Sequence, residues 1–470
     1  MADLLALLVQ SGNSLGVHSA AVATAGNNVA NANTPGYSRQ IANLVSNPAT
    51  AVMGNNTVGT GVGLQSITQA RDQFIERQLP NALAAQAASE SESSSLQSIS
   101  ALDADLAGGL TSTLGAFYSS MRALAQNPGD AALRQVAVGS SDQLARSFNQ
   151  TVSSIDLART GIDAQIQGDV SNINAAASQL SDLNKRIQQS RSTSGQPNDL
   201  LDKRQSAVDT LARLTGGTPY TNGNGDISLA LPGGTALVTD SGAGHLSAVV
   251  DPANNGHLTL QFTRADGSGP VALPVTAIGG EVGGYLAARD GAMKTAITSL
   301  DQFAFNLATS LNTVHAAGYA PDGTTGRSLF TIPATATGAA SQMSVNASVL
   351  ADPRLLAAAT TSPAATGDNR NILAMIATES HPLASGSDPI SSLQLIVTGF
   401  GNSAEQAKAM ADHNGAIATH LTQLRDSTSG VSIDEEMINL TKAQKAYEAV
   451  AKVILTANQM LDTLMTLKTP

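Results

Sequence analysis

The last 40 residues of the chain constrain its fold more than any other part. Between Val431 and Thr469 the sequence has neither Gly nor Pro. Two lines of residues each recur there with a period of seven, and the two lines alternate at intervals of three and four. The first line is Ile433, Leu440, Tyr447, Ile454 and Leu461, and the second is Ala443, Val450, Ala457 and Leu464; together we call them the seam. This spacing is typical of a coiled coil, and Ser432, followed three residues later by Glu435, predicts a capping box at its start. The sequence therefore predicts a helix of roughly 50 Å, at ~1.5 Å per residue.

A second striped helix is predicted at the N-terminus, from about Leu4 to Ala30. One line of this helix is apolar and recurs every seven residues, and its companion line is mostly small: Leu8, Leu15, Val22 and Val29, and Leu5, Gly12, Ser19 and Gly26. The small line predicts that another helix approaches closely. Three internal glycines make the helix marginal in isolation. We expect the two terminal helices to pair with each other and to be ordered only when packed.

Composition excludes several classes of protein. The formal net charge of −11 argues against nucleic-acid binding, which needs a basic face. The absence of cysteine excludes disulfides and thiolate metal sites. No apolar run approaches the ~20 residues of a membrane span, and the first residues lack the basic start of a cleaved secretory signal. Charged residues make up 13% of the chain, about half of the usual ~25%, which indicates surfaces that become buried in an assembly.

Between the terminal helices the character of the sequence changes twice. Residues 66–214 are mostly helical in pattern, and residues 216–276 alternate polar and apolar side chains between Asn-Gly and Pro-Gly turns, which predicts β-hairpins. The expected helical stretches are 114–125, 131–158, 162–191, about 286–316, 371–380, 390–398 and 403–426. We therefore expect a mainly α protein with an inserted β domain, in three parts: a terminal coiled-coil domain of residues 1–60 and 430–470, a long-helix bundle body of 61–214 and 285–429, and a small outer β domain of hairpins at 215–284.

No motif predicts catalysis, a cofactor or a metal. His413 and His420 share one helix face, but a zinc site needs more ligands at tighter spacing. The NGNGD stretch at 222–226 lacks the acidic alternation and closing Glu of a calcium loop, so a hairpin turn is favoured. The GNSLG stretch fits the nucleophile-elbow pattern, but Ser14 lies within a predicted helix and not between a strand and a helix. We predict that the chain is not an enzyme.

Several stretches resemble one known family. AGNNVANANTPGYSRQ (25–40) resembles the N-terminal signature of bacterial flagellar rod, hook and hook-associated proteins, and residues 430–467 resemble the C-terminal helix of the same family. Within the family, ALAQNPGDAALRQVAV (123–138), GGEVGGYLAARDGAM (279–293) and LNTVHAAGYAPDGTTGRSLF (311–330) resemble the hook-associated members that join hook and filament. The single β stretch leaves little room for the second outer domain that larger members carry.

The resemblance implies an extracellular structural protein that assembles as a ring or helical layer, with its terminal helices paired in the inner tube of the flagellum. Its implied partners are copies of itself, the hook protein below, the second hook-associated protein above, the flagellar type III export apparatus and an export chaperone. Export without a cleaved signal, and no binding to nucleic acid or membrane, are also implied.

Two alternatives stay open. A rod or hook protein would turn to β structure soon after the N-terminal motif, whereas helix is expected here after residue 71. A secreted coiled-coil adhesin or export effector would be a soluble monomer with ordered ends.

Both terminal motifs supply candidate assembly residues. The N-terminal candidates are Asn27, Asn28, Asn31, Thr34, Pro35, Gly36 and Tyr37. Asn27 and Asn31 lie one turn apart, and amides donate and accept without carrying charge, so we hypothesise that they bond neighbouring subunits. The alternative is that Asn residues cap the end of the helix. Pro35 and Gly36 predict a type II turn that ends the helix near Thr34 and sends the chain outward.

The C-terminal candidates are expected to act in assembly or in binding the export chaperone. They are the nine seam residues Ile433, Leu440, Ala443, Tyr447, Val450, Ile454, Ala457, Leu461 and Leu464. Among them, Leu440, Tyr447, Val450 and Ile454 are the expected chaperone anchors.

Overall fold

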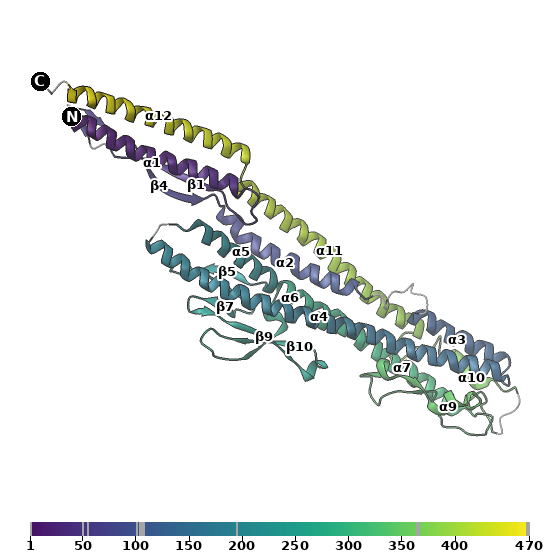
Figure 1. The fold of residues 1–470 in the computed structure, drawn as a ribbon. Coiled ribbons are helices and arrows are strands. Elements are labelled where there is room, and N and C mark those ends of the chain that lie inside the picture. The colour runs from purple at the N-terminus through teal and green to yellow at the C-terminus, as the bar shows by residue number, and fades with distance from the viewer. Residues whose placement is uncertain are drawn as a thin grey trace.

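The molecule is elongated, and both chain ends lie at one tip (Figure 1). The computed structural model describes residues 2–48, 51–53, 56–99, 102, 109–193, 196–362 and 367–466. Its long helices are α1 (Ala2–Ala30), α2 (Gln73–Gln97), α3 (Leu110–Gln126), α4 (Ala131–Thr193), α5 (Asn198–Thr215), α7 (Lys294–Ala317), α11 (Pro389–Ser429) and α12 (Ile433–Thr466). Shorter elements are α6 (Gly280–Leu286), the π-helical η4 (Ala287–Met293), α8 (Ala339–Gln342), α9 (Ala347–Ala351), α10 (Arg370–Ala377), and the 3₁₀ turns η2 (Pro252–Asn254), η3 (Val275–Ala277) and η5 (Pro353–Leu355). The predicted mainly α fold with paired terminal helices is confirmed.

The terminal layer consists of α1, α12 and a β-ribbon. Helices α1 and α12 run antiparallel, side by side (Figure 1). Strand β1 (Gln40–Ser46) pairs antiparallel with β4 (Val62–Gln69), and this ribbon packs on α1. Between them, β2 (Ala51–Met53) pairs with β3 (Asn56–Val58). The predicted mostly helical stretch of 66–214 is confirmed except at its start, where β4 stays paired with β1 as far as Gln69, past the predicted domain boundary at residue 60.

Two helices of the body are longer than predicted. Helix α4 runs unbroken for 63 residues, across the expected break between 158 and 162, and α11 runs for 41 residues through Gly399 and Gly401. A glycine inside a helix costs about 1 kcal/mol relative to alanine. A Cβ added at Gly161, Gly399 or Gly401 would meet no neighbouring atom, so these glycines lie on open faces. Packing of the opposite faces keeps the helices continuous despite the glycines.

One apolar core runs through the helical body and into the β insertion. It contains Leu114 of α3, Phe148 of α4 and Leu307 of α7, together with Leu246 and Phe262 from the strands. The β insertion therefore shares its core with the body. No described residue of α1 or α12 belongs to this core, so the terminal layer is held together by contacts of its own.

The β insertion is built of hairpins, as predicted. Strands β5 (Thr218–Thr221), β6 (Ile227–Ala230), β7 (Ala236–Thr239) and β8 (Gly242–Ala243) form one antiparallel sheet in that order, and β9 (His245–Val250), β10 (Leu258–Thr263) and β11 (Val271–Leu273) form a second with β10 in the middle. A short pair, β12 (Phe330–Thr331) with β13 (Ser344–Val345), lies outside the insertion. In the NGNGD stretch, Asn222 Oδ1 accepts from the backbone N–H groups of Asn224 and Asp226 at 3.2 and 3.0 Å. The hairpin-turn interpretation of that stretch is confirmed.

Candidate functional site

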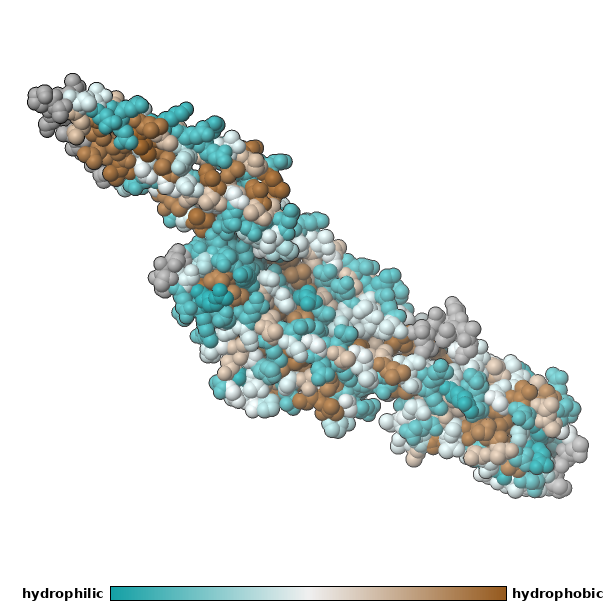
Figure 2. Space-filling view, in the orientation of Figure 1, coloured by the Kyte–Doolittle hydropathy of each residue, from teal (hydrophilic) through white to brown (hydrophobic). Residues whose placement is uncertain are grey.

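The terminal layer carries much exposed apolar surface. More than half of the exposed large apolar side chains among the described residues lie there. They are Leu5, Leu7 and Val9 of α1, Ile41, Leu44, Val45 and Leu64 of the ribbon, and Ile433, Met437, Ile438, Tyr447, Val453, Leu455, Met460, Leu464 and Met465 of α12. Figure 2 shows hydrophobic side chains gathered over this tip of the molecule. Only two charged residues, Asp3 and Arg39, occur in the first 70 positions, so little electrostatic repulsion opposes close packing of this region.

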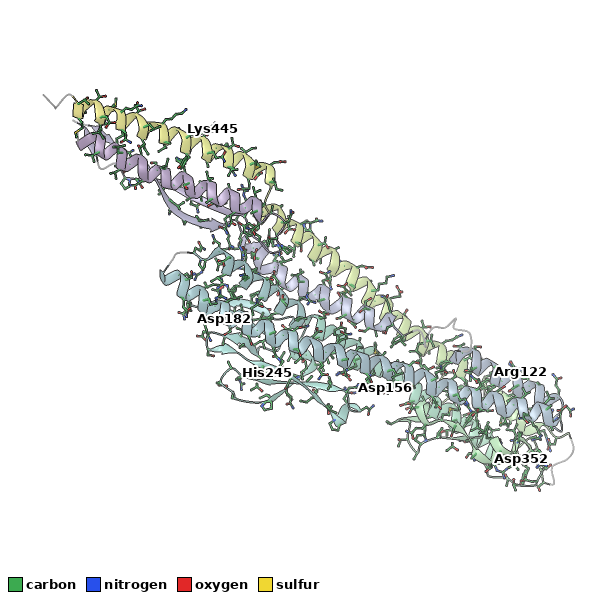
Figure 3. All side chains as sticks on the ribbon, viewed as in Figure 1. Arg122, Asp156, Asp182, His245, Asp352 and Lys445 are labelled. Carbon is green, nitrogen blue, oxygen red and sulfur yellow. The ribbon has the colours of Figure 1, made fainter. Side chains whose placement is uncertain are left out.

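The predicted seam of α12 faces α1 along most of its length. Ala457 is buried, and Leu440, Ala443, Val450, Ile454 and Leu461 are half-buried. The remaining three members, Ile433, Tyr447 and Leu464, are exposed. Lys445 lies on the side of α12 away from α1 (Figure 3), where it bonds Glu448 at 3.0 Å. The isolated chain thus covers only one side of α12 and leaves apolar side chains open beside the seam.

The predicted small-residue line of α1 does not face α12. Gly12, Ser19 and Gly26 are exposed, as is Leu5, and a Cβ added at either glycine would meet nothing within 4 Å. The buried side chains of α1 are instead Ser11, Ser14, Val17, Thr24, Ala25 and Asn28. Helix α1 lies between two partners, α12 and the ribbon, so its buried positions do not follow a single line. A single line of small residues would be buried only if α1 packed against one helix alone.

The Asn28 side chain joins three segments of the terminal layer. It is 1% exposed. Its Oδ1 accepts from the Tyr37 hydroxyl at 2.8 Å and from the Gln40 backbone N–H at 2.9 Å. Its Nδ2 donates to the Gln40 carbonyl at 2.8 Å and to Glu436 Oε2 at 2.9 Å. All four hydrogen-bonding positions of the amide are therefore used within the chain.

Glu436 is the second centre of this network, and sequence reasoning did not select it. The carboxylate is 2% exposed, and Arg39 Nε donates to its Oε1 at 2.8 Å. The Arg39 guanidinium also reaches Glu435 at 3.1 Å, and the Arg39 backbone N–H donates to the Ser429 carbonyl at 2.8 Å. Two signals were available: Arg39 is the one Lys or Arg in the first 70 residues, and Glu436 lies seven residues before Ala443.

The Thr34–Tyr37 stretch forms the predicted turn. The Tyr37 backbone N–H donates to the Thr34 carbonyl at 3.2 Å, and Gly36 has φ of 77°, as the third position of a type II turn requires. The turn borders a cleft of about 890 Å³ between the terminal layer and the body. Burial raises the pKa of the Tyr37 hydroxyl to about 12, with Asp202 and Glu436 adding to the shift. The hydroxyl therefore stays protonated and remains a donor to Asn28 at neutral pH.

Asn27 and Asn31 lie outside the buried network. Asn31 Nδ2 donates to the carbonyl and the Oδ1 of Asn27 at 2.9 and 2.8 Å, and the Thr34 hydroxyl donates to Asn31 Oδ1 at 3.3 Å. Asn31 thus caps the end of α1, as the local alternative requires. Asn27 is exposed, and the structure gives its amide nitrogen no acceptor among the described residues. Its N–H groups are free for a neighbouring molecule.

The structure places the other candidate residues, the two histidines and Ser14, on long helices. His413 and His420 are exposed on α11, and Ser14 lies in the middle of α1. Within the described ranges no three His, Cys, Asp or Glu side chains are grouped to hold a metal ion. None of the helices in the part of the chain that the structure describes combines the length and apolarity needed to cross a membrane.

Comparison with known proteins links the two ends and the middle of the chain to one system. Residues 96–330, half of the chain, match the sequence profile of the flagellar hook-associated protein FlgK helical domain. Residues 423–467 match the flagellar basal body rod FlgEFG protein C-terminal profile, and residues 17–37 match that of the flagella basal body rod protein. Strands β1–β4 follow the N-terminal motif directly, and the helix expected after residue 71 then begins at Gln73 as α2. The helical domain is what separates this chain from them.

Whole-chain relatives agree. The flagellar hook-associated protein 1 of Escherichia coli (strain K12) is 27% identical, with 96% of this chain and 97% of that protein covered. That of Bacillus subtilis (strain 168) is 28% identical, with 95% of each covered. The flagellar hook junction protein FlgK from Burkholderia pseudomallei has the same fold, with a TM-score of 0.68 at 19% identity over 75% of this chain and all of that one. The chain belongs to the family of the flagellar hook-associated protein FlgK, structural components of the bacterial flagellum.

Proposed function

We propose that this chain forms the junction layer between flagellar hook and filament by self-assembly through its terminal helices. The observation that carries the proposal is the exposed apolar surface of α1, α12 and the ribbon. Burial of apolar surface contributes roughly 25 cal/mol per Å², and for these side chains that contribution arrives only when copies pack together. The proposed role is structural, without catalysis.

The partners follow from this location. Copies of the chain pack beside one another as a ring or helical layer, with the hook protein below and the second hook-associated protein above. The flagellar type III export apparatus delivers the chain outside the cell, and an export chaperone covers the C-terminal region beforehand. The half-buried seam residues Leu440, Val450 and Ile454, with the exposed Tyr447, become accessible to a chaperone when α12 separates from α1.

A strain that lacks this chain tests the proposal. We expect it to form hooks of normal length and to release unassembled filament protein into the medium, because the filament has no layer on which to grow. Electron microscopy of the cell surface and the amount of filament protein in the medium are the measurements. Missing hooks would indicate a rod or hook component, and intact filaments would indicate a different class of function.

We propose that the Asn27 amide bonds a neighbouring subunit. Replacing Asn27 and Asn31 together with alanine should leave thermal unfolding of the purified chain unchanged within about 1 °C, because both side chains bond only each other, the helix end and Thr34. The same variant should fail to restore filaments to the deletion strain. Restored filaments would limit both residues to the local capping that the structure already gives Asn31.

A further inference from the structure

The period of seven in α12 places a buried carboxylate on the helix seam. Glu436 lies seven residues before Ala443, on the line that continues through Val450 and Ala457. Glu436 is 2% exposed, whereas Ile433, on the apolar line beside it, is 49% exposed. A polar residue at a seam position makes a helix pair less stable than an apolar one does, and its best-attested use is to select one register.

The partners of this carboxylate occur at one alignment of the two helices. Asn28 Nδ2 and Arg39 Nε donate to its two oxygens at 2.9 and 2.8 Å. At the other end of the pair, Leu4 of α1 and Met460 of α12 line one apolar hollow. The hydrogen bonds and the shared hollow belong to the same unslipped antiparallel alignment. The polar contacts at one end and the shared hollow at the other therefore agree on where α12 lies along α1.

Other alignments leave the carboxylate poorly satisfied. Sliding α12 by one period of seven would bring Glu436 from Asn28 to the level of Ala21. Only Asp3 and His18 are ionisable on α1, so His18 would offer one ring N–H in place of an amide and a guanidinium. Sliding it the other way carries Glu436 past the end of α1 and away from Asn28. A carboxylate buried without its cation is strongly disfavoured, whereas the small and apolar remainder of the seam tolerates a slip.

We propose that Glu436 is the register determinant of the terminal helix pair, with Asn28 and Arg39 as its positioning partners. The proposal deepens the proposed function and rests on it for its biological meaning. Identical register gives every copy the same arrangement of exposed apolar side chains, which a regular layer of subunits requires. Asp3, at its first turn, is the one side chain of the glycine-containing α1 that is charged at neutral pH, and among the described residues no ion pair joins α1 to α12.

Cysteine cross-linking of the purified full-length chain tests the proposal, because the chain contains no cysteine of its own. A Leu4→Cys, Met460→Cys pair reports the native register, and a Leu4→Cys, Val453→Cys pair reports the slip by one period of seven. A short bis-maleimide is applied at dilution, and intramolecular products are quantified by mass spectrometry. We expect the native pair to react at least tenfold more than the slipped pair in the otherwise unchanged chain.

Substitution of Glu436 should change that ratio. With Glu436→Leu, the slipped product should rise to within about threefold of the native one. Glu435→Leu, the same change at an exposed neighbour, should keep the native preference, and so should Glu436→Gln, whose amide oxygen still accepts from Asn28. An unchanged preference in Glu436→Leu, or equal or absent cross-links in the unsubstituted chain, would overturn the proposal. Cross-linking is measured on single chains, so the register proposal can fail while assembly at the hook succeeds. The register proposal can equally hold while assembly fails.

Discussion

Replacing Asn28 with alanine is expected to open the terminal helix pair while the helical body stays folded. The substitution removes the four hydrogen bonds of a buried amide and leaves Glu436 Oε2 and the Tyr37 hydroxyl without their partner. Breaking a buried polar network that holds a charge costs about 3–5 kcal/mol. Hydrogen exchange should therefore show protection of α12 amides falling by about 100-fold or more, at 1.4 kcal/mol for each factor of ten.

The adjacent asparagine provides the matched control. Asn27 belongs to the same motif but is exposed, so Asn27→Ala should change α12 protection by no more than the equivalent of about 0.5 kcal/mol. Amides of α4 should keep their protection in both variants, because the terminal layer shares no described core residue with the body. Equal protection of α12 in Asn28→Ala and Asn27→Ala would show that the network does not hold the pair together.

The second large effect is expected on assembly and not on stability. Leu455 and Met460 are 62% and 55% exposed on α12. Replacing both with glutamate should leave the unfolding free energy of the isolated chain within about 1 kcal/mol of its starting value, since more than half of each side chain is exposed. Burying two unpaired carboxylates against a neighbouring copy costs several kcal/mol each, so the variant should not enter the layer.

Export must be separated from assembly in this experiment. Thr441→Glu adds one glutamate at an exposed polar position of α12, against two in the double variant, and should assemble normally. Both variants should appear in the medium of the deletion strain in similar amounts, which would show that the proposed export apparatus still accepts them. A Leu455→Glu, Met460→Glu chain that stays inside the cell would point to the chaperone or the export apparatus and not to the subunit interface.

The period of seven at the two ends of the chain is the pattern that predicts the terminal helices. The stretch without Gly or Pro predicts the long α12, the apolar line with a period of seven predicts α1, and Pro35 with Gly36 predicts a type II turn. These three features follow from the local sequence. The hairpins of the insertion follow in the same way from their turn residues. These features depend on neighbours in the sequence, which is why pattern reasoning finds them.

The remaining features depend on contacts that are distant along the chain. Glu436 and Arg39 are 397 positions apart, and a glutamate at the start of a helix is explained locally as a favourable end charge. Only the fold reveals that its carboxylate is buried. The sequence predicts breaks at Gly161 of α4 and at Gly399 and Gly401 of α11 that the structure does not have, because a single sequence does not show which face of a helix packs. The small-residue line of α1 was misassigned because the ribbon, its second partner, has no periodic pattern strong enough to predict.

Occupancy of the hook tip tests the central claim, that the exposed apolar side chains of the terminal helices are the subunit interface. Fluorescently labelled chains are produced in the deletion strain, and labelled hook tips and attached filaments are counted. The unsubstituted chain and Thr441→Glu should label most tips and restore filaments. Leu455→Glu, Met460→Glu should be exported at similar levels, label almost no tips and leave filament protein in the medium. Tips labelled by that variant as often as by the unsubstituted chain, with filaments attached, would contradict the account.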